Sequence, residues 1–298
     1  MESANGCMLC PRHCGAKREY DETGVCGCSS ELKVARAALH MWEEPCISGT
    51  RGSGAVFFSG CPLHCIFCQN REISDGRAGK SITVGRLGHI FLELQDKGAA
   101  NINLVTAGQY ADKVVEAVKT ARRNGLTIPV ICNTGGYETE ETLKLLGEVC
   151  DVWLPDLKYL NAETARGFSH AADYPEVAVK AIDYMVRQAG EVVLGDDGYI
   201  RRGVIVRHLV LPGHRKESEE VIGYLYRTYG DSVYLSIMNQ YTPPQERLPY
   251  PELNRRLTTY EYDKVVDYAL SLGVKNAFVQ ERGTAKESFI PAFDYEGV

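Results

Sequence analysis

Regular alternation of short apolar runs with helix-like stretches is the feature that most limits what this 298-residue chain can fold into. From residue 55 onward the apolar runs are Ala55–Phe58, Asn101–Val105, Ile128–Cys132, Val152–Leu154, Gly203–Leu211, Val233–Met238 and a last short one at Ala277–Val279. Between the first two runs, apolar residues fall at helical spacing at Leu87, Ile90, Phe91 and Leu94. Repeated strand–helix units predict a parallel sheet with helices packed outside it.

Six such units are too few to close an eight-stranded barrel. We therefore expect an α/β fold, an open (β/α)6 partial TIM barrel, over residues 55–298. In parallel barrels the functional side chains lie on loops that follow the carboxyl ends of strands. The residues that follow each apolar run are thus where a site is expected.

The composition limits compartment and partners. A formal net charge of −6 gives no bulk attraction to nucleic acid or to an anionic membrane. No apolar stretch approaches the ~18 residues of a membrane helix, and no basic-then-apolar leader opens the chain, so we expect a cytoplasmic protein. Eleven cysteines in a reducing compartment favour metal or cluster ligation over disulfides.

The first 54 residues differ from the rest because they combine little periodicity with a high density of cysteines, namely Cys7, Cys10, Cys14, Cys26, Cys28 and Cys46. We expect residues 1–54 to form a cysteine-rich extension. Its candidate metal ligands are Cys7, Cys10, Cys14 and Cys26. Two occupants are open: a second iron–sulfur cluster, which would relay electrons or bind substrate through a free iron, and a zinc ion, which would fold the segment.

A second group of cysteines, Cys61, Cys65 and Cys68, directly follows the apolar run at 55–58 and Ser59-Gly60. A four-iron cluster is normally held by four thiolates, so a loop with three leaves one iron open to a small molecule. Zinc is the alternative, since His64 could complete a set of four ligands. The position of the loop after a strand favours the cluster.

The Cys-x3-Cys-x2-Cys spacing, with Phe67 before the last cysteine and Gln69-Asn70-Arg71 after it, resembles the defining motif of the radical S-adenosylmethionine (SAM) family. The resemblance implies a [4Fe–4S] cluster on Cys61, Cys65 and Cys68, with SAM chelating the fourth iron. It also implies electron transfer that splits the sulfonium into a 5′-deoxyadenosyl radical. Within this resemblance Phe67 is a cofactor-binding candidate.

Two later strand ends resemble those of the glycyl-radical-enzyme activases, a group that includes pyruvate formate-lyase activating enzyme. By this resemblance the SAM-binding candidates are Asn133, Thr134, Asp156 and Lys158. Asp156 and Lys158 lie one residue apart on a strand and so share a face. An ordinary surface ion pair is the alternative for these two residues. Asn133 stands where the activases have an aspartate.

Thr106 and Arg207 are two further candidates for SAM binding. Thr106 follows the second apolar run, where the family usually has a Gly-Gly-Glu-like segment that binds the methionyl amino group. The acidic residue is missing here, and a polar turn is the alternative. Arg207 lies inside an apolar strand and must reach a carboxylate, either that of SAM or that of a buried salt bridge.

Together these motifs predict a radical SAM oxidoreductase similar to pyruvate formate-lyase activating enzyme, which takes a hydrogen atom from its substrate. The first candidate substrate is a glycine of a partner protein, a glycyl radical enzyme. Another peptide, a metabolite or an RNA base is the alternative within the enzyme class. A non-catalytic iron–sulfur or zinc protein for electron transfer or scaffolding is the alternative of another class. The enzyme would need a low-potential electron donor of the flavodoxin or ferredoxin type.

Overall fold

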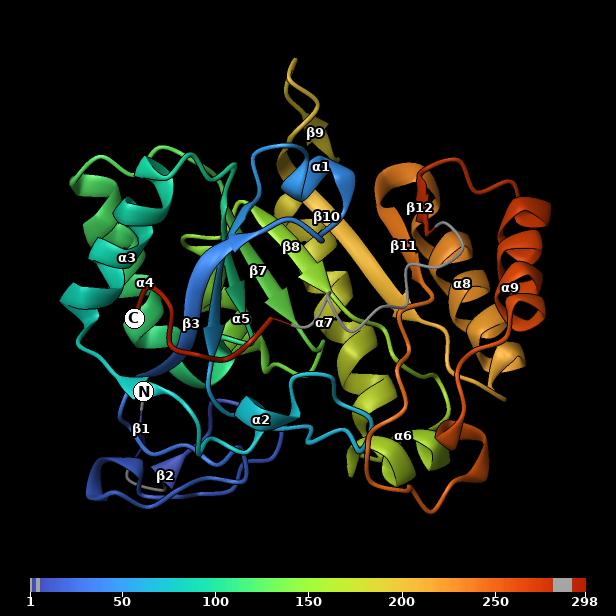
Figure 1. The fold of residues 1–298 in the computed structure, drawn as a ribbon, viewed down its shortest axis with the longest axis horizontal. Helices are drawn as coiled ribbons and strands as arrows, with labels where there is room; N and C mark the ends of the chain where they lie inside the picture. The colour runs from blue at the N-terminus through green and yellow to red at the C-terminus, as the bar shows by residue number, and fades with distance from the viewer. Residues whose placement is uncertain (1, 4–5, 281–290) are drawn as a thin grey trace.

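The computed structural model describes residues 2–3, 6–280 and 291–298. Its centre is a sheet in which parallel strands neighbour one another in chain order (Figure 1). These strands are β4 (Ser53–Phe58), β6 (Ile102–Val105), β7 (Val130–Thr134), β8 (Val152–Pro155), β10 (Ile200–Leu209), β11 (Tyr234–Met238) and β12 (Ala277–Val279). Each strand lies beside its predecessor, as in a barrel wall, while the described strands form an open path. The predicted α/β partial barrel is confirmed.

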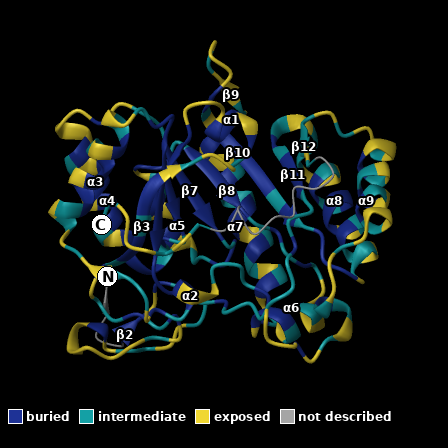
Figure 2. Ribbon diagram, in the orientation of Figure 1, coloured by how far each residue is buried: buried dark blue, intermediate teal, exposed yellow. Residues whose placement is uncertain are grey.

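Helices cover the outer face of this sheet (Figure 1). They are α3 (Val84–Asp96), α4 (Ala111–Arg123), α5 (Glu140–Gly147), α7 (Tyr174–Ala189), α8 (Arg215–Tyr229) and α9 (Thr259–Leu272), while α6 (Ala162–Ser169) lies beyond the carboxyl end of the strands. In α3 the expected apolar stripe is buried, and exposed residues face outward (Figure 2). Truncating one such leucine to alanine costs about 2–5 kcal/mol.

Short antiparallel strands extend the sheet: β3 (Lys33–His40) on β4, β5 (Lys80–Ser81) on β3, and β9 (Val193–Leu194) on β10. β3 lies within the predicted extension of residues 1–54, yet it belongs to the main sheet. Its buried residues do not alternate strictly, which is why the sequence pattern did not indicate a strand. β1 (Glu2–Ser3) and β2 (Gly6–Cys7) form a separate pair. The division of the chain into domains at residue 54 stays a prediction.

The C-terminal segment 291–298 covers the edge of β3 that β5 leaves open (Figure 1). Tyr295 N–H donates to the carbonyl of Ala35 at 3.2 Å, and Ala37 N–H donates to the carbonyl of Glu296 at 2.8 Å. Because unpaired edge strands promote association with other chains, this cover protects the sheet.

The amino-terminal end of the barrel is closed by α1 (Pro45–Ser48). Ile47 is fully buried and belongs to a cluster with the inward-facing Ile131, Leu154 and Ile205. The opposite end, where the parallel strands finish, holds the cavity described below. In the described part of the chain, no helix is long and apolar enough to cross a membrane.

Candidate active site

The Cys61–Cys68 loop begins where β4 ends and is followed by α2 (Arg71–Ser74). Gly60 makes the turn out of the strand with φ 86°, and a Cβ atom there would lie 2.0 Å from Cys28 Sγ. Only glycine fits this position. The Cys61 N–H donates to the carbonyl of Cys26 at 3.2 Å, so the loop is fixed against the N-terminal segment from its first cysteine.

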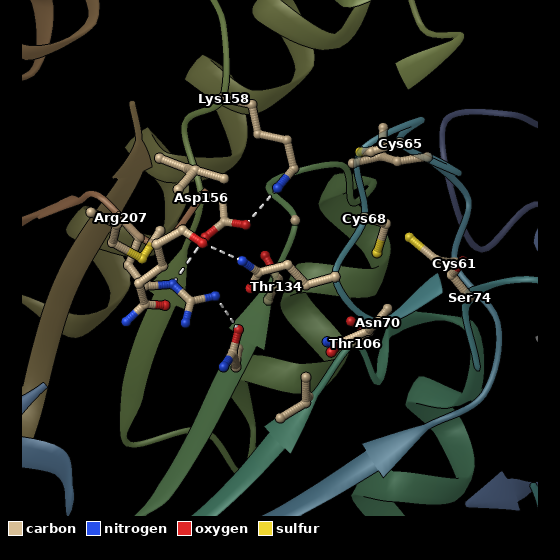
Figure 3. A pocket seen from close by; sticks show the side chains of 18 of the residues that line it. Cys61, Cys65, Cys68, Asn70, Ser74, Thr106, Thr134, Asp156, Lys158 and Arg207 are labelled. Atoms are coloured by element: carbon tan, nitrogen blue, oxygen red, sulfur yellow. Dashed lines mark hydrogen bonds and ion pairs between the residues drawn. The ribbon is translucent and has the colours of Figure 1, made fainter. Parts of the chain in front are cut away.

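Cys61, Cys65 and Cys68 line one cavity of about 240 Å³ (Figure 3). Burial raises the pKa of Cys61 to about 11 and that of Cys68 to about 12. These thiols are therefore protonated at neutral pH, and binding a metal group as thiolates would release their protons. His64, the fourth ligand that zinc would need, does not line the cavity, and its Nε2 lies 2.6 Å from the carbonyl of Val25.

Asp156, Lys158 and Arg207 form a charged cluster across the cavity from the thiols (Figure 3). Lys158 Nζ lies 2.6 Å from Asp156 Oδ2, and Arg207 Nε donates to Asp156 Oδ1 at 2.9 Å. Arg207 Nη2 donates to Asn133 Oδ1 at 2.6 Å. The strands β7, β8 and β10 thus bring all four predicted residues together at their carboxyl ends.

Electrostatic pairing keeps this cluster charged despite its burial. Burial opposes the charge of Asp156, but Arg207 and Lys158 together lower its pKa. Burial also opposes the charge of Lys158, and the neighbouring Asp156 raises its pKa. The three groups carry one net positive charge, which suits a carboxylate ligand. Because the Asp156 and Lys158 side chains are only 18% and 19% exposed, they form a cavity pair rather than a surface pair.

Thr106 and Thr134 line the same cavity at the ends of β6 and β7. Thr134 Oγ1 donates to Glu138 Oε2 at 3.0 Å and accepts the N–H of Gly136 at 3.0 Å. Thr106 has φ 58°, a left-handed conformation that is uncommon for a β-branched residue. Backbone strain of this kind concentrates at functional sites.

Gln109 lies where the family resemblance would place an acid, and it serves the loop instead of this cavity. Its Nε2 donates to the carbonyls of Ser59 at 2.9 Å, Gly60 at 3.0 Å and Thr106 at 2.8 Å. Gln109 therefore ties the end of β4 to the end of β6. Glu138 is a further carboxyl group near this place, bonded to Thr134 and lining the second cavity.

Phe67 lines the cavity and packs edge-to-face against Phe168 at 6.2 Å, with Tyr241 at 6.1 Å on another side. These contacts fix the loop between its second and third cysteines. A contact of Phe67 with a cofactor stays a prediction.

Sequence analysis missed Glu43, which reaches the cavity from the segment before α1. Asn103 Nδ2 donates to Glu43 Oε1 at 2.9 Å, and Arg207 Nη1 lies 3.4 Å from Glu43 Oε2. Burial raises the pKa of Glu43, while Arg207 works in the opposite direction. The one signal that could have found it is the need of Arg207 for carboxylates inside an apolar strand.

The N-terminal candidates Cys7, Cys10, Cys14 and Cys26 line a second, smaller cavity, and Cys61 belongs to the walls of both cavities. Cys28 does not line it, because its Sγ donates to the carbonyl of Ser59 at 3.2 Å. A hydrogen bond from Cys28 and the charge of Arg18, acting against burial, lower the pKa of Cys26 to about 6.

Both sets of thiols border cavities and do not meet at one point. Among the described residues, no three His, Cys, Asp or Glu side chains form a group that could hold a metal ion. The first cavity, of about 240 Å³, leaves room for a group larger than a single ion.

The first strand of this open parallel barrel leads into a three-cysteine loop, and the charged cluster lies opposite that loop. Such an arrangement is typical of a protein that binds a cluster together with a carboxylate-bearing ligand. A family model for the radical SAM superfamily matches residues 55–225, which is more than half of the chain. The chain belongs to the radical SAM superfamily.

Relatives extend over most of the chain. Uncharacterized protein MJ0674 of Methanocaldococcus jannaschii is 30% identical over 270 residues, which cover 88% of this chain and 74% of that protein. Pyruvate formate-lyase 1-activating enzyme of Escherichia coli K12 is 23% identical over 209 residues, covering 67% of this chain and 74% of the enzyme. The structure of Streptococcus suis SuiB bound to precursor peptide SuiA superposes with a TM-score of 0.51 and 11% identity, covering 74% of this chain and 46% of SuiB.

The superfamily's cofactors, a [4Fe–4S] cluster and SAM, fit the residues of this cavity. Three thiols on one loop leave one iron of such a cluster without a protein ligand. The net positive charge of Asp156, Lys158 and Arg207 suits the carboxylate of an amino-acid ligand. The chain is thus a radical SAM enzyme that uses a [4Fe–4S] cluster and SAM.

Proposed function

We propose that this enzyme abstracts a hydrogen atom from a polypeptide, with a backbone glycine of a partner protein as the first candidate. In this proposal Cys61, Cys65 and Cys68 hold the cluster. The SAM-binding residues are Phe67, Thr106, Asn133, Thr134, Asp156, Lys158 and Arg207. The observation that supports the SAM chemistry of the proposal is that the three thiols and the charged cluster face one another across a single cavity.

The chain's own residues bind, orient and exclude water. When bound, the cluster and SAM supply one-electron cleavage of the sulfonium to the 5′-deoxyadenosyl radical that abstracts hydrogen. Lys158 offers a compact ammonium to the carboxylate of SAM, and Asp156 fixes the position of that ammonium. Arg207 acts on Asp156 and is a positioning residue. Phe67 and Leu209 give the cavity an apolar surface that keeps water from the reacting atoms.

One relative and one structural neighbour support a polypeptide substrate. The E. coli enzyme is named for activating pyruvate formate-lyase, which is itself a protein. SuiB was seen bound to a precursor peptide. The cavity lies at the open end of the barrel, and Gln240 in its wall offers amide groups that can pair with a peptide backbone.

Cleavage of SAM is the first test. Anaerobically reconstituted protein with SAM and dithionite should release 5′-deoxyadenosine and methionine. Replacement of Cys61, Cys65 and Cys68 by alanine should abolish this release. A protein that serves only electron transfer or scaffolding would release none before replacement, and release that persists in the triple variant would contradict the ligand assignment.

Hydrogen transfer tests the substrate class. Glycine-containing peptides with deuterium at the glycine Cα should give deuterated 5′-deoxyadenosine, whereas peptides deuterated only in side chains should not. Transfer from a metabolite or an RNA, with none from peptides, would overturn the polypeptide proposal and leave SAM cleavage intact.

A further inference from the structure

The second cavity is lined by thiols of the kind that bind metal groups. Its walls carry five cysteines: Cys7, Cys10, Cys14 and Cys26 from the N-terminal segment, and Cys61 from the three-cysteine loop. Two of the sulfurs meet at Gly24: a Cβ atom there would lie 3.2 Å from Cys14 Sγ and 3.5 Å from Cys26 Sγ. A side chain at position 24 would therefore enter the space between these two thiols.

A buried cation lies beside the thiols. Arg18 is 3% exposed, and its Nη1 lies 3.9 Å from Cys7 Sγ. Its other hydrogen bonds go to carbonyl groups, those of Ser29 and Gln109. No carboxylate lies within 4 Å of this guanidinium in the part of the chain that the structure describes. Besides these carbonyls the guanidinium lies over the ring of Tyr110, and thiolates bound to a cluster would add negative charge beside this buried cation, which favours them.

The loop that carries Cys7, Cys10 and Cys14 is docked on the barrel by side-chain hydrogen bonds. Arg12 Nε donates to the carbonyl of Pro62 at 2.9 Å, and its Nη2 donates to the carbonyl of Ser169 at 3.0 Å. Thr142 Oγ1 donates to the carbonyl of Leu9 at 2.6 Å. Because these bonds run to the Cys61 loop and to the helices around the cavity, the second cavity has a fixed place beside the first.

We infer that Cys7, Cys10, Cys14 and Cys26 bind a second iron–sulfur cluster that passes electrons to the SAM cluster. Four thiolates satisfy all four irons, so no iron is left open for substrate. Zinc also binds four thiolates, at about 2.3 Å each, so the metal content of the protein separates the two occupants. Cys28 does not line the cavity and is left out of the ligand set, while its thiol lies between the carbonyls of Ser59 and Cys26.

Few covalent and hydrogen bonds separate the two sites along the path that an electron would take. The carbonyl of Cys26 accepts the N–H of Cys61 at 3.2 Å, and Cys61 lines both cavities. One electron from a low-potential carrier protein of the flavodoxin or ferredoxin class reduces the second cluster from its 2+ to its 1+ core. The same electron then moves to the SAM cluster, and the second cluster returns to 2+. Cys14 is exposed, so the carrier can approach this side of the molecule.

Metal analysis and electron paramagnetic resonance test the site itself. Anaerobically reconstituted protein should contain about eight irons and eight sulfides per chain, because each cluster carries four of each. The Cys10→Ser/Cys14→Ser variant should fall to about four, and its remaining reduced signal should still change on adding SAM, which shows that the barrel is folded. Cys28→Ser is the matched control, and should keep about eight.

Two results would overturn the site. One is about four irons with one zinc in the unmodified protein, where the double variant loses only zinc. The other is an iron content that the double variant leaves unchanged. Cys7→Ser offers an independent second variant should the double variant be unstable.

The relay role rests on the proposed function, and its test separates the two. Dithionite is small and can reduce the SAM cluster directly, so the double variant should release 5′-deoxyadenosine within about twofold of the unmodified rate. With reduced flavodoxin or ferredoxin as donor, the rate should fall at least tenfold. Equal losses with both donors would overturn the relay, whereas no release from the unmodified protein with either donor would count against SAM cleavage itself.

Discussion

The two cysteine sites share a wall at Cys61, yet different parts of the fold put them in place. The three-cysteine loop continues β4, a strand buried along its whole length, so the sheet itself fixes the loop. The N-terminal thiols precede the sheet and are positioned by side-chain bonds to distant carbonyls. Arg12 reaches Pro62, 50 positions away, and Arg18 reaches Gln109, 91 positions away.

Because of this difference, we expect the N-terminal site to depend on the barrel more than the three-cysteine loop depends on the N-terminal segment. The three-cysteine loop should change less when the N-terminal segment is disturbed, because β4, which leads into it, is paired in the sheet, while its bonds to that segment are those at Cys61, Pro62 and His64. The N-terminal site should be lost when the barrel around it is disturbed. It should also be sensitive to single residues such as Arg18, which are not ligands.

The largest expected effect is a loss of SAM affinity when the charged cluster is changed, with both sets of thiols left as they are. Lys158→Ala removes the ammonium proposed for the SAM carboxylate, and hydrogen bonds to charged groups contribute about 1.5–3 kcal/mol. SAM affinity should fall about 10- to 100-fold, with iron content unchanged at both sites. Equilibrium dialysis with labelled SAM and iron analysis measure this. Lys144→Ala, an exposed lysine paired with Glu140, is the control.

Unchanged SAM affinity in Lys158→Ala would mean that the pair with Asp156 serves the fold alone. Asp156→Asn should also weaken SAM binding, since Lys158 and Arg207 would lose their shared partner. It should reduce stability as well, because breaking a buried pair costs about 3–5 kcal/mol.

A smaller effect, confined to the N-terminal site, is expected from Arg18→Gln. Removal of the buried positive charge should lower the reduction potential of the second cluster and its retention, so iron should fall from about eight toward four. SAM cleavage with dithionite should stay near the unmodified rate. Redox titration followed by paramagnetic resonance measures the potential. Arg166→Gln, an exposed arginine on α6, is the control, and equal behaviour of the two variants would contradict a role for Arg18 at the cluster.

Gly24→Val should reduce iron at the N-terminal site only in part. Its side chain would enter the space between Cys14 and Cys26 without removing a ligand. Faster iron loss to a chelator is the expected result. Gly85→Ala is the control, because its nearest atom is Thr83 Oγ1 at 3.8 Å. Iron loss at the unmodified rate would show that a side chain at position 24 does not disturb cluster binding by Cys14 and Cys26.

The smallest effect concerns Glu138, which lines the second cavity and accepts a bond from Thr134 in the first. Burial raises its pKa to about 7 from an ordinary value of 4.5. The folded protein thus holds this proton more tightly than the unfolded chain, and the resulting stability is lost as pH rises from about 4.5 to 7. Glu138→Gln should therefore gain stability over the unmodified protein as the pH rises from 5 to 8.

Urea denaturation of the metal-free protein at both pH values measures this gain. Glu140→Gln, at an exposed position on α5, should show no such pH dependence. A pH-independent difference for Glu138→Gln would mean that this carboxyl group is already ionised at pH 5.

The sequence predicted the strands because buried parallel strands are continuous apolar runs. β7 differs from its predicted run: it continues through Asn133 and Thr134, whose polar side chains face the cavity. β3 was not predicted, since burial on both of its faces leaves no period of two. The three-cysteine loop could be predicted from a short stretch of sequence, since its three cysteines are close together in the chain.

Other features of the site could not be predicted from local patterns. Glu43 enters the cavity through its partners Asn103 and Arg207, which are distant in the chain. Glu138 follows β7 in a polar turn, and only the fold brings it near both cavities. The sequence also indicated Cys7, Cys10, Cys14 and Cys26 as ligands without indicating that Cys61 would stand beside them. Such contacts depend on tertiary structure, which spacing does not encode.

The segment 291–298 that covers β3 is synthesised after the parallel strands on which it packs. Translation adds residues 291–298 after all of the parallel strands, yet Pro291 lines the first cavity and Glu296 pairs with β3. A nascent chain can therefore have its thiols and its barrel strands in place before this part of the wall exists. Because Pro291 lines the cavity while Glu296 bonds to β3, this segment joins the cavity wall to the edge of the sheet.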